Sequence, residues 1–138
     1  MRIEIPDWGL ILMIGASGAG KSTFARKHFR ATEVLESDHY RNVVGDEARD
    51  GRTTRDAFAV MAEITRRRLL AKRRAVIDAT NLAPEDRRTF LDAARAAHAP
   101  MAAVVVDPGL KACLEHNEAR TSGRAAGPSR GRRRAAVR

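Results

Sequence analysis

The stretch Leu10–Ser22, LILMIGASGAGKS, decides the fold of this chain. Its first five residues, Leu10–Ile14, form a continuous apolar run, which is typical of a strand buried on both faces of a parallel sheet. The next eight residues, Gly15–Ser22, match the pattern GxxxxGK[ST] in full. Because the pattern follows a buried strand and opens a helix, it predicts a loop that holds phosphate groups.

The chemistry of such a loop comes from its backbone and from two side chains. The glycines let the backbone curl so that successive N–H groups point inward, and these groups and the helix N-terminus hold phosphate oxygens. Lys21 would place a positive charge on the β- and γ-phosphates, and the hydroxyl of Ser22 is a hard oxygen ligand for magnesium. We therefore expect ATP and Mg²⁺ to bind. The predicted nucleotide-binding residues are Gly15, Ala16, Ser17, Gly18, Ala19, Gly20, Lys21, Ser22 and Thr23.

Outward from this stretch, apolar strand-like runs alternate with helical patterns. A capping-box pattern, Thr53 followed by Asp56, predicts a helix start near Arg55, and the polar stretch Arg41–Arg52 with its two glycines predicts a loop. The alternation predicts an α/β three-layer sandwich of the P-loop NTPase type, with a parallel sheet of four or five strands. The predicted strands are Leu10–Ile14, Glu33–Glu36, Ala75–Ala79 and Met101–Val106, and the predicted helices run from Lys21 to about Arg30, Arg55–Lys72, from Pro84 onward and from Pro108 to about Arg120.

Composition and charge indicate one small domain with a basic end. The chain has 138 residues, a net charge of +9 and a single cysteine, Cys113, so an internal disulfide is excluded and a reducing compartment is favoured. No run is long enough to span a bilayer and the first residues do not form a signal peptide, so we expect a cytoplasmic protein without a membrane partner. We predict a P-loop kinase-like domain over residues 1–120 and a flexible tail over residues 121–138. From residue 120 onward the chain has no acid and carries arginines at positions 120, 124, 130, 132, 133, 134 and 138.

Two roles are possible for this basic tail. Its positive charge would attract polyanions such as nucleic acid or nucleotide phosphates. It could equally be a solvated end that has no specific partner.

Candidate residues for phosphoryl transfer follow the second predicted strand. An acceptor hydroxyl needs a carboxylate within hydrogen-bond reach, and Asp38 lies just past Glu36, at the sheet edge where ligands bind. Arg41, three residues further on, is a candidate for holding an acceptor phosphate. A turn or helix cap is the alternative role for Asp38.

The third predicted strand ends in a second set of polar residues, Asp78-Ala79-Thr80-Asn81. Asp78 would bind magnesium directly or through water, or only hydrogen-bond to Ser22 and the loop. Asn81 would cap the next helix or reach the acceptor. Transfer also needs positive charge on the migrating phosphoryl group, and Arg120 and Arg124 are candidates for a mobile lid over it.

Taken together, these segments resemble the kinase module of bacterial polynucleotide kinase-phosphatases. The resemblance runs to about Arg120 and includes GASGAGKSTFARKHFRATEVLESDHYR (Gly15–Arg41), VIDATN (Val76–Asn81) and CLEHNEAR (Cys113–Arg120). It implies transfer of the ATP γ-phosphate to a nucleic-acid 5′-hydroxyl, with Asp38 as general base. It also implies that Arg41 contacts the acceptor's phosphate backbone and that a lid arginine maps near Arg120 or Arg124.

The chain departs from the pattern of that family in its last third. His116 stands where the family has a lid arginine, and the segment after Arg120 is short and arginine-rich, as in a chain truncated at its C-terminus. Three hypotheses therefore stay open: a polynucleotide 5′-kinase, a kinase of a small-molecule hydroxyl, and a nucleotide-binding protein that transfers nothing.

Overall fold

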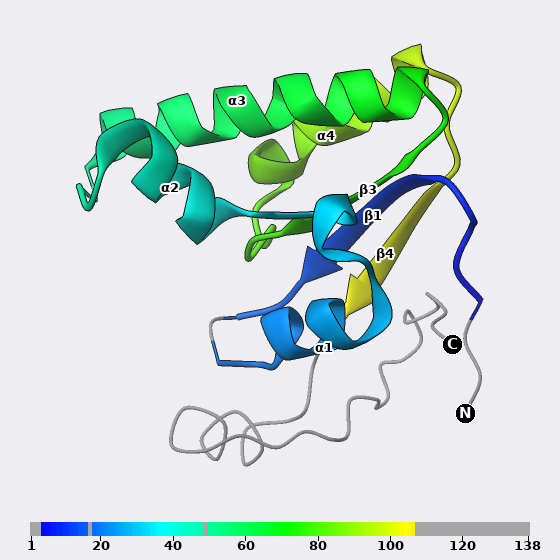
Figure 1. The fold of residues 1–138 in the computed structure, drawn as a ribbon, viewed down its shortest axis with the longest axis horizontal. Helices are drawn as coiled ribbons and strands as arrows, with labels where there is room; N and C mark the ends of the chain where they lie inside the picture. The colour runs from blue at the N-terminus through cyan, green and yellow to red at the C-terminus, as the bar shows by residue number, and fades with distance from the viewer. Residues whose placement is uncertain (1–3, 17, 49, 107–138) are drawn as a thin grey trace.

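The computed structural model describes residues 4–16, 18–48 and 50–106, and strands and helices alternate through them (Figure 1). The strands are β1 Gly9–Ile14, β2 Val34–Glu36, β3 Arg74–Asp78 and β4 Met101–Val105. The helices are α1 Lys21–His28, the 3₁₀ turn η1 Ala31–Glu33, α2 Ser37–Gly45, α3 Gly51–Leu70 and α4 Pro84–Ala96. The α/β fold predicted from the sequence is confirmed.

The four strands of the described residues form one parallel sheet in the order β2-β3-β1-β4. β1 lies in the interior of the sheet, between β3 and β4, and Leu10, Ile11 and Met13 are fully buried. The sequence of β1 is apolar without interruption because both of its faces are covered.

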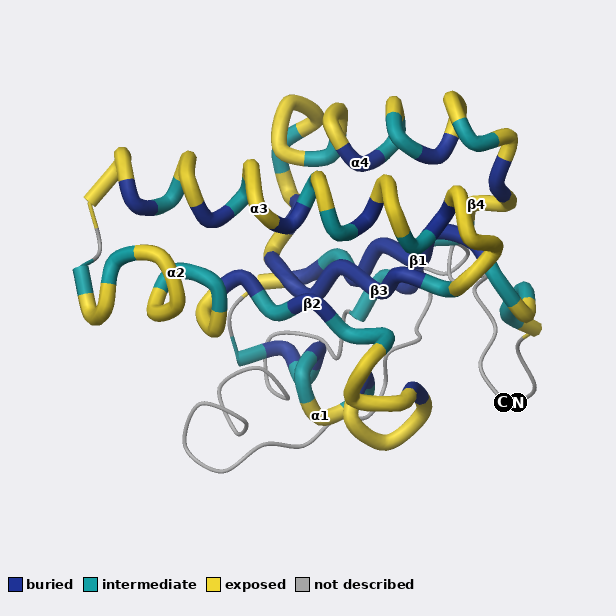
Figure 2. Tube along the Cα trace, turned by 45° about the horizontal axis from the view of Figure 1, so that its top comes forward, coloured by how far each residue is buried: buried dark blue, intermediate teal, exposed yellow. Residues whose placement is uncertain are grey.

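Helices cover both faces of the sheet, as Figures 1 and 2 show: α3 and α4 lie on one face and α1 on the other. Alternate residues of β1 serve the two layers. Leu10 and Leu12 pack with Met61 of α3 and Phe90 of α4, whereas Ile11 and Met13 pack in the cluster that includes Ala25 and Phe29. The sheet therefore divides the core into two layers.

All four strands point the same way, so their carboxyl ends meet at one edge of the sheet. Met13 of β1 and Glu36 of β2 are both in register with Asp78 of β3. The phosphate loop, the start of α2 and the loop after β3 all leave the sheet at this edge (Figure 1). Parallel pairing brings together three segments that are far apart in the sequence.

The predicted loop over Arg41–Arg52 is wrong for its first half, because α2 extends from Ser37 to Gly45. Such a short helix has little stability alone and depends on packing, here against α3. Gly45 belongs to this contact, since a Cβ on it would lie 2.6 Å from Cγ2 of Thr53. The glycine that indicated a loop permits two helices to pack closely.

The start of α3 also differs from the prediction. The helix begins at Gly51, and its N-cap is Asp50, whose carboxylate accepts a hydrogen bond from the backbone N–H of Thr53 at 2.7 Å. Thr53 is therefore the N3 residue and is buried, whereas the sequence pattern had placed it outside the helix. Aspartate is as good an N-cap as threonine, so the pattern alone did not discriminate between the two.

The helix predicted from Pro108, the lid arginines and the basic tail lie outside the described residues. Within the described ranges, no helix is both long and apolar enough to cross a membrane.

A substitution at Phe90 tests the packing between the sheet and α4. Its side chain is 1% exposed and packs with Phe58, so Phe90→Ala should lower the free energy of unfolding by about 3–5 kcal/mol. Leu82→Ala is the control, because Leu82 is 57% exposed and its truncation should change stability by about 0.5 kcal/mol or less. Denaturant titration measures both, and equal effects would contradict the packing described here.

Candidate phosphate-binding and acceptor site

The phosphate loop joins the end of β1 to the first turn of α1. Gly20 is the N-cap residue of α1 and has φ 102°, a left-handed conformation that favours glycine. Gly18 has φ 84°, and the backbone N–H of Ala19 donates to the carbonyl of Ala16. Backbone conformation therefore requires glycine at positions 18 and 20, as the tight turn of a phosphate-binding loop needs.

Lys21 begins α1 and its side chain lies back over the loop. Its Nζ donates to the carbonyl oxygen of Ala16 at 3.3 Å, and the residue is only 8% exposed. Burial lowers the pKa of Lys21 below 10.5, while the carboxylates of Asp78 and Asp38 partly oppose that shift. Lys21 therefore lies within electrostatic reach of both acids and has lost much of its own hydration.

Ser22 and Asp78 form the candidate magnesium site. The Ser22 hydroxyl donates to Oδ2 of Asp78 at 2.7 Å, which joins α1 to the end of β3. Asp78 is 5% exposed. In the described part of the chain no cluster of three or more His, Cys, Asp or Glu could hold a metal alone. Two protein oxygens suit Mg²⁺, which keeps waters and takes further oxygens from phosphates.

Asp38 and Arg41 lie on one face of α2 and are joined to each other. The Arg41 guanidinium donates to Asp38 Oδ1 at 2.8 Å, to Ser37 Oγ at 3.3 Å and to Thr54 Oγ1 at 3.2 Å, and it also lies over the Phe58 ring. The Asp38 side chain is 84% exposed, whereas that of Arg41 is only 21% exposed. Arg41 thus ties α2 to α3 and fixes the orientation of an accessible carboxylate.

Asn81 follows β3 and is almost fully buried, with 1% of its surface exposed. Its Nδ2 donates to the carbonyl of Met13 at 2.9 Å, and its φ of 53° is left-handed. The neighbouring Thr80 carbonyl accepts from the N–H of Gly15. The Asn81 side chain therefore links the loop after β3 to the end of β1. Its Oδ1 has no partner among the described residues.

A pocket of about 600 Å³ lies beside these groups, between α3 and the start of α4. Its lining includes Arg41, Thr54 and Phe58, together with Thr80 and Asn81 from the loop after β3. Glu85 and Asp86 of α4 bring two acids to the lining, and Arg41 and Arg55 bring two cations. The sequence pattern predicts Phe58 as a core residue on the inner face of its helix, and it gives no signal for a role of Thr54 in this pocket.

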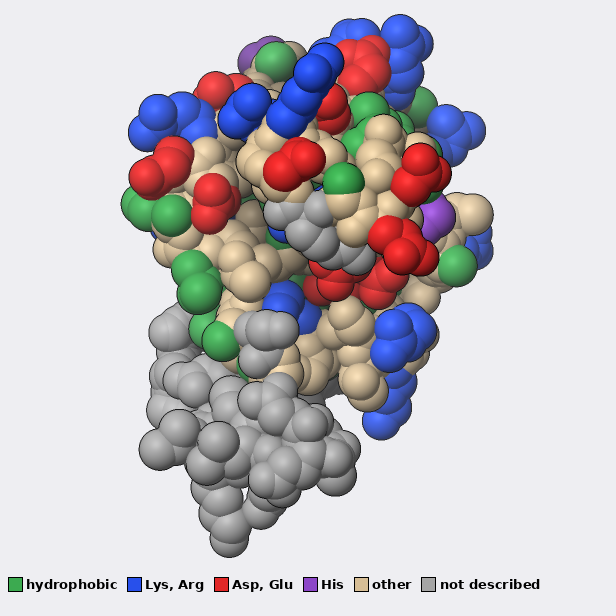
Figure 3. Space-filling view, turned by 90° about the vertical axis from the view of Figure 1, so that its left-hand side faces the viewer, with side chains coloured by type: hydrophobic (Ala, Val, Ile, Leu, Met, Phe, Trp, Pro, Cys, Tyr) green, Lys and Arg blue, Asp and Glu red, His purple; other side chains and the backbone are tan. Residues whose placement is uncertain are grey.

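The structure brings together Lys21, Ser22, Asp38, Arg41, Asp78 and Asn81 at the carboxyl edge of the sheet. Thr23 is exposed on α1, one residue beyond the magnesium-site serine. Ser17, Arg120 and Arg124 lie outside the described residues, so the predicted lid stays a prediction. The face seen from the α2 end carries acidic and basic side chains interspersed (Figure 3).

A parallel sheet of this order, with a glycine-rich loop leading from its inner strand into a helix, defines an α/β fold of the P-loop kinase type. Residues 10–135 match the family model described as an AAA domain, and the chain belongs to that family. No curated protein sequence matches the chain significantly.

Solved structures share this fold at low identity. A candidate kinase from Chloroflexus aurantiacus is 15% identical, with TM-score 0.67. The match covers 83% of the present chain and 68% of the Chloroflexus chain. Mycobacterium tuberculosis APS kinase CysC, in complex with AMPPNP and APS, is 21% identical, with TM-score 0.58. That match covers 83% of the present chain and 70% of the CysC chain. A chain of the Pnkp1/Rnl/Hen1 complex is 17% identical, with TM-score 0.67, covering all of this chain. The present chain spans 46% of the length of that protein.

The lowered pKa of Lys21 predicts a pH dependence of nucleotide affinity. Bound phosphates favour the ammonium form, so ATP affinity should be constant while free Lys21 is protonated and fall as pH rises through its lowered pKa. The decline should therefore begin below pH 10.5, and its limiting slope is tenfold per pH unit. Titrations of wild type and Lys21→Ala between pH 7 and 10.5 measure it, and parallel curves for the two proteins would contradict this role.

Proposed function

We propose that the chain is an ATP-dependent kinase that transfers the γ-phosphate to the 5′-hydroxyl of a polynucleotide. The observation that carries the proposal is the position of Asp38. This exposed carboxylate is oriented by Arg41 and lies within electrostatic reach of the phosphate-loop lysine. A carboxylate base next to a phosphate cradle is the arrangement that phosphoryl transfer to a hydroxyl requires.

In this proposal the loop and Lys21 hold the triphosphate. The backbone N–H groups at the start of α1 and the Lys21 ammonium would bind the phosphate oxygens. Ser22 and Asp78 would hold the ion, with the Ser22 hydroxyl turned from Asp78 toward it. Bound Mg²⁺ would neutralise charge that develops on the phosphates. The short Ser22–Asp78 contact keeps these two oxygens close together before the ion arrives.

Asp38 would act on the acceptor. Its carboxylate would accept the proton of the acceptor hydroxyl as that oxygen attacks the γ-phosphorus, and the bond from phosphorus to the bridging oxygen of ADP would break. The products are ADP and the phosphorylated acceptor. The hydrogen bond from Arg41 holds one oxygen of Asp38, which leaves the other oxygen for the hydroxyl.

The acceptor is inferred from likeness to other proteins. The sequence resemblance to polynucleotide kinase-phosphatases and the structural likeness to a chain of the Pnkp1/Rnl/Hen1 complex support a nucleic-acid 5′ end. Arg120 and Arg124, the arginines that the sequence assigns to a lid, would complete the site.

The acceptor pocket favours a second candidate, a kinase of a small-molecule hydroxyl. Glu85 and Asp86 in its lining would repel a polyphosphate strand, while the volume of about 600 Å³ suits a compact ligand. The likeness to APS kinase supports this alternative.

An assay of phosphate transfer tests the proposal. The purified protein is incubated with Mg²⁺ and γ-labelled ATP, with and without a 5′-hydroxyl oligonucleotide. Label should pass to the oligonucleotide, and Asp38→Asn should reduce the rate by about 10²–10⁴-fold because the general base is lost. Lys21→Ala should weaken ATP binding and transfer together.

Asp92→Asn is the matched control, because Asp92 is also an exposed helix acid that pairs with an arginine three residues away. It should leave transfer unchanged. ATP binding that depends on Lys21, without label on any oligonucleotide, would reject the polynucleotide kinase. A panel of sugar and nucleoside acceptors would then separate the small-molecule kinase from a protein that only binds nucleotide.

A further inference from the structure

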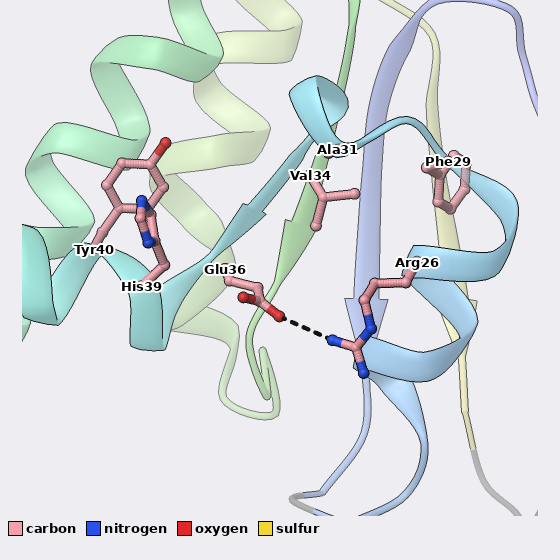
Figure 4. A pocket seen from close by; sticks show the side chains of 7 residues that line it. All are labelled: Arg26, Phe29, Ala31, Val34, Glu36, His39 and Tyr40. Carbon is pink, nitrogen blue, oxygen red and sulfur yellow. Dashed lines mark ion pairs between the residues drawn. The ribbon is translucent and has the colours of Figure 1, made fainter.

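A second pocket, distinct from the acceptor pocket, lies at the edge strand β2, between α1 and α2 (Figure 4). Its volume is about 530 Å³. It adjoins the magnesium site in two ways: Arg26 is one helical turn after Ser22, and Glu36 is in register with Asp78. Arg26 and Glu36 form an ion pair of 3.6 Å across the pocket.

Aromatic side chains flank this edge pocket. His39 and Tyr40 follow Asp38 directly in α2, and their rings meet edge to face with centroids 4.8 Å apart. Phe29 contributes a third ring from the end of α1. His39 is exposed, so its ring is available to a ligand. Aromatic rings beside an arginine and a carboxylate suit a planar, polar-edged ligand, as a nucleobase is.

A basic hollow of about 570 Å³ lies at the amino end of the same strand. Arg74, at the start of β3, is already paired with Glu33 at 3.4 Å. Four further cations line the hollow against one further acid, Asp7: they are Arg30, Arg68, Lys72 and Arg73. Their charges are not balanced within the hollow, which therefore favours an anionic occupant.

The dipole of α3 explains only part of this cluster. Arg68 and Lys72 lie at the C-terminal end of α3, where cations are favourable in any protein. Arg73 is held there too, because its backbone N–H donates to the carbonyl of Arg68 at 2.8 Å. Arg30 precedes the 3₁₀ turn η1 and is therefore not placed by that helix. Arg30 and Arg73 are both exposed.

The two hollows are lined by neighbouring residues of one short segment of the chain. Thr32 and Glu33 line the basic hollow, while Val34 and Glu36 line the edge pocket, and Asp38 follows two residues later. Between Glu33 and Asp38, the strand β2 Val34–Glu36 has three residues and spans about 10 Å at a strand rise of about 3.3 Å per residue.

We propose that this surface is a single-strand track: the acceptor strand leaves Asp38, places a base in the edge pocket beside His39, and sets its next phosphates in the basic hollow. This inference rests on the proposed function and narrows it to single-stranded 5′ ends of about four nucleotides or more. An acidic peptide would match the charge of the hollow but would make no use of the aromatic pocket.

The test measures binding, separately from transfer. Full-length protein is titrated into 3′-fluorescein-labelled oligothymidylates of eight and two nucleotides, and anisotropy gives their affinities across a series of salt concentrations. The octamer should bind more tightly than the dimer. His39→Ala should weaken octamer binding about fivefold or more, and His39→Phe should restore it, because stacking on a ring is worth that much.

The double variant Arg30→Ser/Arg73→Ser should lower the slope of log affinity against log salt by about 1.4, the counterion term for two phosphate contacts of a single strand. The matched control is Arg66→Ser/Arg95→Ser, which removes two exposed helix arginines that line neither hollow. It should retain the wild-type slope.

Equal slopes for the two double variants would overturn the track, as would octamer binding that is insensitive to His39. Competition by polyglutamate for the octamer site would also overturn the track if it depended only on Arg30 and Arg73. The basic hollow would then be a site for an acidic peptide. If the binding pattern holds but wild type transfers no phosphate, the proposed reaction fails and the strand-binding surface stands. If transfer to the octamer occurs with an unchanged KM in all variants, the reaction stands and the track fails.

Discussion

The parallel pairing of β1 with β3 is the constraint on which the candidate site depends. It sets Met13 beside Asp78, so the phosphate loop and the acid that ends β3 leave the sheet at the same level. The Ser22–Asp78 hydrogen bond then closes the gap between α1 and β3. Parallel strands bring their carboxyl ends to one edge, where loops of different origin converge on a common ligand.

A second set of contacts places the acceptor side of the site. Arg41 spans from Asp38 on α2 to Thr54 on α3, and Gly45 allows those helices to approach closely. Arg41 is therefore a positioning residue in this structure, with its guanidinium engaged by protein groups. Any contact between Arg41 and an acceptor phosphate would compete with those hydrogen bonds, and this links acceptor binding to the orientation of Asp38.

Charge is distributed differently at the two ends of the sheet. The carboxyl edge holds Lys21 between Asp78 and Asp38, and its acceptor pocket carries two acids. The hollow at the amino end gathers cations from α3, β3 and the turn before β2. A nucleic-acid acceptor would therefore be attracted mainly by groups remote from the reacting atoms, since the reaction edge itself is of mixed charge.

The sequence by itself determined the phosphate loop and the alternation of strands and helices, because these follow from local patterns of glycine and apolar residues. For the same reason it placed Asp38 just after the second strand and Asp78 at the end of the third. It missed α2 and misplaced the start of α3. Those features depend on contacts between segments, such as Gly45 against Thr53 and Arg41 against Thr54. Only the tertiary structure assembled the aromatic edge pocket and the basic hollow, because each is lined by residues of several elements that carry no common sequence signal.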